Sequence, residues 1–255
     1  MPRKYDNPPL IEALCEFRFL GEQAWDWTIP GILYEKIKAD YPEKRQEGVL
    51  EVPVRPTPEA VLVELKTGIS KMQFFRADRS ALVQVGPDLL AVNAVPQGTE
   101  HLYPGWPAFK PEALKHLATY RAIANPRTLT RVGVRYINRV AVPTGEKFSL
   151  GRYFRVLPNL PAGLPQVLST ILINVEVPFD DLPGTLRFIF GSVSSEQPDV
   201  AHFLLDMEMY AAGEQVPDLD EVDGWLEKAH DRVEAAFDES FTEEAHRDIF
   251  REKAA

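Results

Sequence analysis

The stretch that decides the fold opens the chain and reads Tyr5-Asp6-Asn7-Pro8-Pro9-Leu10-Ile11-Glu12-Ala13-Leu14-Cys15-Glu16-Phe17-Arg18-Phe19. From Ile11 onward the odd positions are apolar, whereas Glu12, Glu16 and Arg18 stand at even positions. An alternation of period two is typical of a half-buried strand. Proline lacks an amide donor and biases the residue before it toward extended backbone, so the two prolines end any helix and introduce this strand.

Two patches of the chain resemble a sporadically distributed bacterial family of similar length. Its members begin with a Tyr-x-x-Pro-Pro-hydrophobic-x-Glu segment, which corresponds here to Tyr5 through Glu12. The family's closing helix and short terminal helix are matched by His230, Phe237, Thr242 and Glu243. The patches bracket nearly the whole chain, so the resemblance implies one compact unit over residues 1–255. It carries no known activity and therefore implies no catalytic residues.

The amino-acid composition limits the classes of protein to which the chain can belong. The chain has 255 residues, of which 45% are hydrophobic and 26% charged, as in an ordinary globular protein with a substantial core. A formal net charge of −10 disfavours nucleic acid as a partner. The single cysteine excludes an intramolecular disulfide and a Cys-rich zinc site, and it indicates a cytoplasmic location. We expect no signal peptide and no membrane contact, because no apolar run approaches the roughly 20 residues that span a bilayer.

Periodicity and turn residues predict an alternating order of strands and helices. The predicted helices cover 29–40, 111–124 and 220–237, and Thr242 is expected to cap a further short helix. The predicted strands cover 10–19, 61–66, 71–77, 81–85, 89–95, 129–142, 167–177, 185–193 and 201–210, with a turn at Thr67-Gly68 among those that separate them.

These elements predict an α+β fold in which a curved antiparallel sheet is gripped by helices. The order strand, helix, meander, helix recurs in part, which suggests two topologically similar halves, 1–126 and 127–255. No residue-level repeat accompanies this order, so the duplication is a topological hypothesis.

Charged residues on two strands form the first candidate site. Glu12 and Glu16 lie on the polar side of the first strand, and Arg131, Arg135 and Arg139 lie at odd positions of the 129–142 strand. If the strands are neighbours, we expect cross-strand ion pairs on the solvent side of the sheet. Alternatively, these five residues line a groove that receives an anionic ligand, since the arginine fork suits phosphate or carboxylate.

Four further residues have chemistry that two interpretations can explain. His202, Asp206 and Glu208 share the polar side of the 201–210 strand, which is the composition of a general acid–base site and also of any exposed strand. Cys15 lies on the apolar side of its strand, which favours a buried small hydrophobe over a nucleophile.

The loop Tyr103-Pro104-Gly105-Trp106-Pro107-Ala108-Phe109 is the second candidate site. Large aromatic side chains in a loop either pack against the rest of the protein or bind a partner. Tyr103, Trp106 and Phe109 are therefore expected to anchor the following helix to the sheet or to contact a partner.

No motif for nucleotide binding, for serine hydrolysis or for a metalloprotease is present, and the five histidines are far apart in the sequence. We expect neither a cofactor nor a metal. The first functional hypothesis is a non-enzymatic binding or assembly protein that takes a protein partner or self-associates. The alternative is an enzyme or sensor that binds a small anionic ligand in the concavity of the sheet through Arg135, Arg139 and Glu12.

Overall fold

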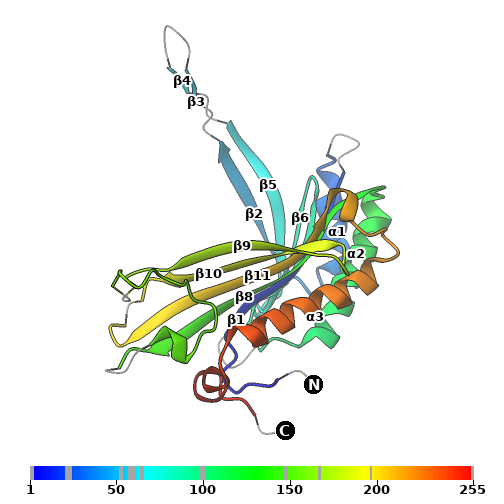
Figure 1. The fold of residues 1–255 in the computed structure, drawn as a ribbon. Coiled ribbons are helices and arrows are strands. Elements are labelled where there is room, and N and C mark those ends of the chain that lie inside the picture. Colours follow the sequence, from blue (N-terminus) through cyan, green and yellow to red (C-terminus); the bar gives the residue numbers. More distant parts are fainter. Residues whose placement is uncertain are drawn as a thin grey trace. The chain divides into compact units, whose positions relative to one another are not determined.

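A computed structural model gives the fold of the chain (Figure 1). It describes residues 3–20, 25–51, 54–56, 61–63, 66–97, 102–145, 149–165, 168–195 and 197–253, and within 49–70 it describes the backbone only.

The described strands form one antiparallel sheet of nine strands and a separate two-stranded hairpin, which confirms the α+β class. The order in the large sheet is β2-β5-β6-β7-β1-β8-β11-β10-β9, and β3 pairs with β4. The strands are β1 (Leu10–Phe19), β2 (Glu43–Glu51), β3 (Val54–Pro56), β4 (Val61–Val63), β5 (Lys66–Phe75), β6 (Ala81–Gly86), β7 (Leu89–Ala94), β8 (Leu129–Pro143), β9 (Leu172–Phe179), β10 (Gly184–Val193) and β11 (Val200–Ala212).

The described residues also form the α-helices α1 (Thr28–Ile37), α2 (Trp106–Ala124) and α3 (Val222–Ser240). Short helical turns cover Leu150–Arg152, Gly213–Gln215 and Ala245–Ile249. Among the helices of the described residues, none is both long enough and apolar enough to cross a bilayer.

The chain divides into two compact units. Unit 1 comprises Met1–Leu14 and Arg131–Ala255, and unit 2 comprises Cys15–Thr130. The boundary near residue 130 lies close to the expected one at 126, whereas the first fourteen residues group with the later part of the chain. The topological duplication of two halves stays a prediction.

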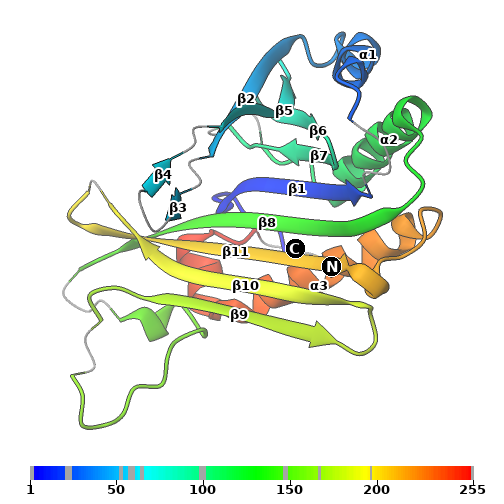
Figure 2. The same cartoon turned by 90° about the horizontal axis from the view of Figure 1, so that it is seen from above.

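The core of unit 1 lies between α3 and one face of β10 and β11 (Figure 2). Alternate residues of β11, from Phe203 to Ala211, are buried on this face. The helix buries a stripe at steps of three and four, made of Val222, Trp225, Leu226, Ala229 and Val233. This stripe is the one that the periodicity predicts, and Phe237 at its end is half-buried. Burial of each large apolar side chain contributes up to about 1.5–3 kcal/mol, so α3 is an integral part of unit 1.

The two ends of the chain meet within unit 1. The Tyr5 hydroxyl lies 2.8 Å from Nδ1 of His246, and the Asn7 amide donates to the Phe250 carbonyl at 3.0 Å. Thr242 caps the last helical turn as predicted, because its Oγ1 accepts from the Ala245 amide at 3.2 Å. The two patches that carry the family resemblance are therefore neighbours in space, although the resemblance itself stays a prediction.

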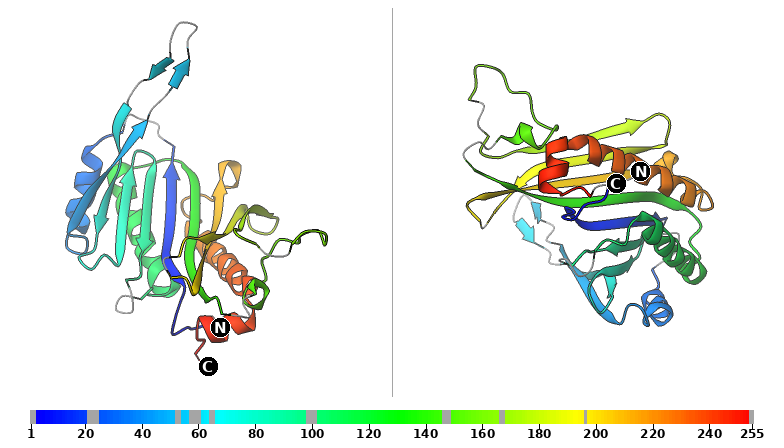
Figure 3. Two further views of the ribbon diagram at one scale, coloured as in Figure 1. Left: turned by 90° about the vertical axis from the view of Figure 1, so that its left-hand side faces the viewer. Right: turned by 90° about the horizontal axis from the view of Figure 1, so that it is seen from below.

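Unit 2 packs α1 and α2 against its strands (Figure 3). Leu33 and Ile37 of α1 are buried, as are Phe109 and Leu117 of α2. From β1, the ring of Phe19 stacks on Tyr120 with centroids 5.1 Å apart. Cys15 is fully buried, and burial raises the pKa of its thiol, which confirms its interpretation as a core residue.

Several predicted boundaries are wrong. The expected 167–177 strand runs from Leu172 to Phe179, and α2 begins at Trp106 because Pro107 suits a first helical turn. Strand β5 continues through the turn expected at Thr67-Gly68. The sequence prediction also omitted β2, whose charged residues Glu43, Lys44, Arg45 and Glu47 obscure the signal of a strand.

The burial of Phe17 gives a direct test of the first strand. Its side chain has no exposed surface, so Phe17→Ala should lower the free energy of unfolding by about 3–5 kcal/mol, through lost transfer energy and the cavity left behind. Urea unfolding followed by circular dichroism measures this loss. A loss below about 1 kcal/mol would show that the apolar side of β1 is not core.

Candidate functional site

The predicted arginines lie on the face of the unit 1 sheet opposite α3. On β8 the even positions from Val132 to Val142 are buried, and Tyr136 among them reaches His230 of α3 with its hydroxyl 2.9 Å from Nδ1. The odd positions, which include Arg131, Arg135 and Arg139, therefore face the other way. The register of β8 with β11 pairs Arg135 with Glu208, which places the acidic residues of β11 on the same face.

Ion pairs join these strands. Arg135 binds Asp206 through two parallel bonds, Nε to Oδ1 at 2.7 Å and one terminal nitrogen to Oδ2 at 2.5 Å. Glu208 accepts from Arg131 at 2.5 Å through one oxygen, and its other oxygen lies 2.9 Å from Arg187 of β10. The carboxylate of Glu208 thus bridges three strands, and bidentate or shared pairs of this kind are stronger than single ones.

Both carboxylates are buried under the arginines. Asp206 is 5% exposed and Glu208 4%, so an unpaired charge at either position would be costly. The hydrogen bond to Asp206 raises the pKa of Arg135, and the charges of Glu208 and Glu12 add to this effect. Gly133 makes room for the arrangement, because a Cβ there would lie 2.9 Å from an oxygen of Glu208.

Of the predicted acidic partners on β1, Glu12 acts on the arginines of β8, because its charge helps to raise the pKa of Arg135. Strands β1 and β8 are neighbours as expected, and the Arg139 amide donates to the Pro9 carbonyl at 2.8 Å. Glu16 accepts from Arg18 at 2.9 Å, whereas Arg139 is exposed and donates from Nε to Nδ1 of His202 at 3.3 Å. The ion pairs with the distances given above join β8 to Asp206 and Glu208 of β11, and Glu12 of β1 adds its charge near Arg135. A ligand role for Glu12, Glu16, Arg131, Arg135 and Arg139 stays a prediction.

The same pairs account for two of the three residues that resembled an acid–base site. Asp206 and Glu208 are bound to arginines, and His202 contacts Arg139 on the same face. A general base needs an atom that points at the substrate and can accept its proton. The oxygens of these carboxylates point at guanidinium groups instead.

The aromatic loop packs inside unit 2. Trp106 and Phe109 are buried, and Tyr103 contacts Phe109 edge-on with centroids 5.8 Å apart. These positions match the interpretation in which the rings anchor α2. A partner contact through Tyr103, Trp106 and Phe109 stays a prediction, and nothing in their packing supports it.

A polar cluster in unit 2 was missed from the sequence. Glu112 of α2 accepts hydrogen bonds at 2.5 Å from the hydroxyl of Tyr41 and from Arg76, and Nε2 of His116 lies 3.9 Å away. Burial opposes the charge, but the nearby His116, the hydrogen bond from Tyr41 and the charge of Arg76 outweigh it, and the pKa of Glu112 is lowered to about 2. In the sequence, the spacing of four residues between Glu112 and His116 could have indicated this cluster.

A second cluster lies on α3. One side-chain ligand atom each from His230, Asp231 and Glu234 lies within 4.8 Å of the others, and Tyr136 holds Nδ1 of His230. Burial and the neighbouring charges of Asp238 and Asp231 raise the pKa of Glu234. The spacing of four between His230 and Glu234 in the sequence could have revealed this group.

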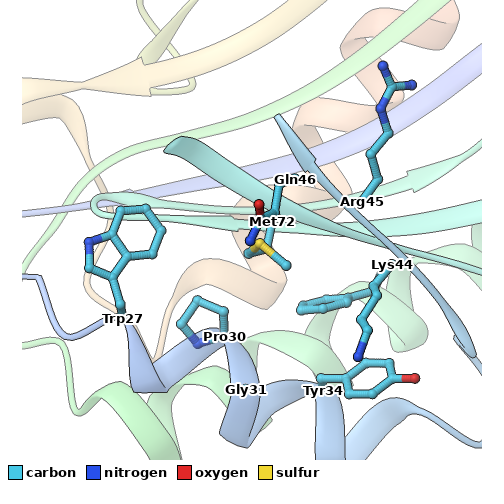
Figure 4. A pocket seen from close by; sticks show the side chains of 9 residues that line it. Trp27, Pro30, Gly31, Tyr34, Lys44, Arg45, Gln46 and Met72 are labelled. Carbon is cyan, nitrogen blue, oxygen red and sulfur yellow. The ribbon is translucent and has the colours of Figure 1, made fainter. Parts of the chain in front are cut away.

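A recess in unit 2 lies between α1 and the paired strands β2 and β5 (Figure 4). Its volume is about 540 Å³, within the range of small-molecule sites. Trp27, Pro30 and Tyr34 line it from α1 and its first turn, and Lys44, Gln46 and Met72 line it from the strands. We call it the α1 groove.

No family model matches this chain, and no curated protein matches it significantly.

The lowered pKa of Glu112 predicts how stability depends on pH. A carboxylate whose pKa is lower when folded stabilises the protein above its unfolded pKa, and this stabilisation disappears as the pH falls through the folded pKa. Glu112→Gln should therefore be less stable than the natural protein by roughly 1–3 kcal/mol at pH 7. The difference should shrink between pH 4.5 and about 2.

Urea unfolding of both proteins across this pH range measures the difference. The control is Glu35→Gln, an exposed glutamate of α1 that pairs with Lys38 and should change stability little at any pH. A difference that stays constant from pH 7 to pH 2 would show that the Glu112 cluster does not hold a stabilising charge.

Proposed function

We propose that the protein is a non-enzymatic assembly protein that pairs with a second copy of itself through the outer edge of β9. This strand is the last in the sheet order and has eight residues. Its exposed apolar edge is the observation that carries the proposal, because the free backbone groups of an end strand are a template for another strand.

The side chains of β9 are exposed on both of its faces. Leu172 is 76% exposed on the face opposite α3, and Val175 and Val177 are 45% and 44% exposed on the face that α3 covers elsewhere. Val193, at the end of the neighbouring strand β10, is exposed as well. Exposed apolar groups gathered at one edge are typical of an interaction site.

Strand β2, at the other end of the sheet order, differs from β9 in its charge. Between Glu43 and Glu47, β2 carries four charged residues in five positions, which is a common protection against edge pairing. Over its eight residues β9 carries one charge, Glu176, and its one proline, Pro178, stands near the end of the strand. Its centre is therefore open to pairing.

The pairing of β9 with β10 shows which backbone groups face outward. The Ser192 amide donates to the Ile171 carbonyl at 2.9 Å, and in an antiparallel ladder the bonded positions alternate. The odd residues of β9 therefore bond to β10. The amide and carbonyl groups of Leu172, Asn174 and Glu176 point away from the sheet, together with the Pro178 carbonyl.

These groups fit a two-fold symmetric, antiparallel pair with Val175 opposite Val175 of the second copy. In this register Asn174 lies opposite Glu176 of the other copy, so the amide can donate to the carboxylate, and Ile173 lies opposite Val177. Moving the register by two residues places Glu176 either opposite itself, where like charges repel, or opposite Leu172, whose side chain offers the carboxylate no donor from the second copy.

The alternative function, a small anionic ligand held by Arg135, Arg139 and Glu12, has less support. The fork of Arg135 is occupied by Asp206, and Arg139 contacts His202. An anion at Arg135 would first have to displace a buried carboxylate.

Cysteine cross-linking tests the proposed pair. Cys15 is fully buried, so Val175→Cys introduces an accessible thiol into a chain whose natural one is protected. Two residues that face each other at a non-bonded position of an antiparallel ladder are close enough for a disulfide. Oxidation should give a dimer on non-reducing gels, whereas the control Ala235→Cys, exposed on α3, should stay monomeric.

A second pair of variants tests the backbone. Asn174→Pro removes an outward amide without touching the bonds to β10, and it should convert a dimer to a monomer in size-exclusion chromatography with light scattering. Asn174→Ala keeps the amide and should remain a dimer. A natural protein that is monomeric at about 100 μM, or a Val175→Cys variant that cross-links no better than Ala235→Cys, would rule the proposal out.

A further inference from the structure

The α1 groove is formed by residues of unit 2, whereas β9 belongs to unit 1, so the groove shares no residue with the proposed pairing. Strand register forms one wall, since Lys44 pairs with Phe74 and Gln46 with Met72. Figure 4 shows the side chains of Lys44, Gln46 and Met72 on the side of α1, and Arg45 lines the groove as well, with its guanidinium directed away from α1.

Glycine keeps the opposite wall open. Gly31 stands in the middle of α1 and lines the groove, and a Cβ at this position would meet nothing within 4 Å. Glycine inside a helix costs about 0.5–1 kcal/mol relative to alanine. Gly31 does not have a positive φ, and no neighbouring atom lies so close that only glycine fits. The effect of Gly31 in the fold is therefore to leave space above the helix.

The rims of the groove are aromatic. Trp27 is 48% exposed just before α1 and lines one end, where a flat apolar group could lie against its ring. Tyr34 lines the other end, and the polarisable side chain of Met72 lies between them (Figure 4). The groove therefore offers aromatic and thioether surface along its length.

One end of the groove is positively charged. The Lys44 ammonium lies 4.7 Å from the ring centroid of Tyr34, and no carboxylate of the described residues forms an ion pair with it. Its acidic neighbours on β2 are engaged elsewhere, since Glu43 pairs with Arg79 and Glu47 with Lys71. In a chain of net charge −10, this is a local site that favours an anion.

From these observations we propose that the α1 groove binds a small organic anion with a flat apolar body, such as an aryl carboxylate or sulfonate. The apolar body lies over Gly31 between Trp27 and Met72, and the anionic group meets Lys44, with the Gln46 amide as a neighbouring donor. The groove volume of about 540 Å³ accommodates a molecule of this class.

Fluorescence titration of the full chain with 8-anilinonaphthalene-1-sulfonate tests the site, with N-phenyl-1-naphthylamine as the uncharged counterpart. Trp27→Ala should weaken both probes at least about fivefold, because the ring supports the apolar body. Lys44→Gln should weaken the sulfonate by a similar factor and leave the uncharged probe unchanged, because only the anion interacts with the ammonium.

A substitution that fills the groove gives the most direct test of the site. Gly31→Leu favours the helix and occupies the space above it, so it should abolish binding of both probes while the melting temperature is retained. The matched control is Gly224→Leu, since Gly224 is also a helical glycine with nothing within 4 Å of its Cβ position, and it lies on α3. A second control, Leu172→Ala, removes exposed apolar surface at β9.

Binding that is lost in Gly31→Leu and kept in both controls supports the proposal. Absence of sulfonate binding to the natural protein overturns it, as does equal affinity in the natural protein, Gly31→Leu and Lys44→Gln. Binding that falls in Leu172→Ala alone assigns the probe to the β9 edge and also overturns the proposal.

Discussion

Unit 1 depends on the register of one strand, β11, because both faces of that strand are committed. Toward α3 it presents apolar residues such as Leu205 and Met207, and on the opposite face it presents Asp206 and Glu208 to arginines of β8 and β10. A slip by one residue would exchange the faces, placing carboxylates under the helix and apolar groups among guanidinium groups. Hydrophobic burial and ion pairing therefore select the same register.

The position of β9 follows from this constraint. Once β11 is fixed, its pairing with β10 fixes β10, whose pairing in turn places β9 at the end of the order. Neither the stripe of α3 nor the ion pairs of the opposite face reach β9, whose Val175 and Val177 stay exposed. Within the chain β9 is contacted by Tyr210 at Glu176 and by Arg232 at Phe179, and these contacts leave its central valines exposed for a second copy.

Local pattern predicts much of this fold but not the partners of its charges. The alternation of β1 and the stripe of α3 follow from periodicity, which the sequence displays directly. Both β1 and β11 lie beside β8, and the sequence does not show that the fork of Arg135 binds Asp206 of β11 while Glu12 of β1 contributes its charge. The α1 groove was out of reach for the same reason, because Trp27 and Met72 meet only through the fold. The charged strand β2 was missed because its residues have low strand propensity.

A double-mutant cycle on Arg135 and Asp206 tests most directly whether ion pairing holds β11 in place. The free energy of unfolding would be measured for the natural protein, Arg135→Gln, Asp206→Asn and the double variant. The account predicts that each single variant is destabilised and that the pair shows a coupling energy of about 1–3 kcal/mol. A coupling energy below about 0.5 kcal/mol would contradict it, since the two residues would then act independently despite their two hydrogen bonds.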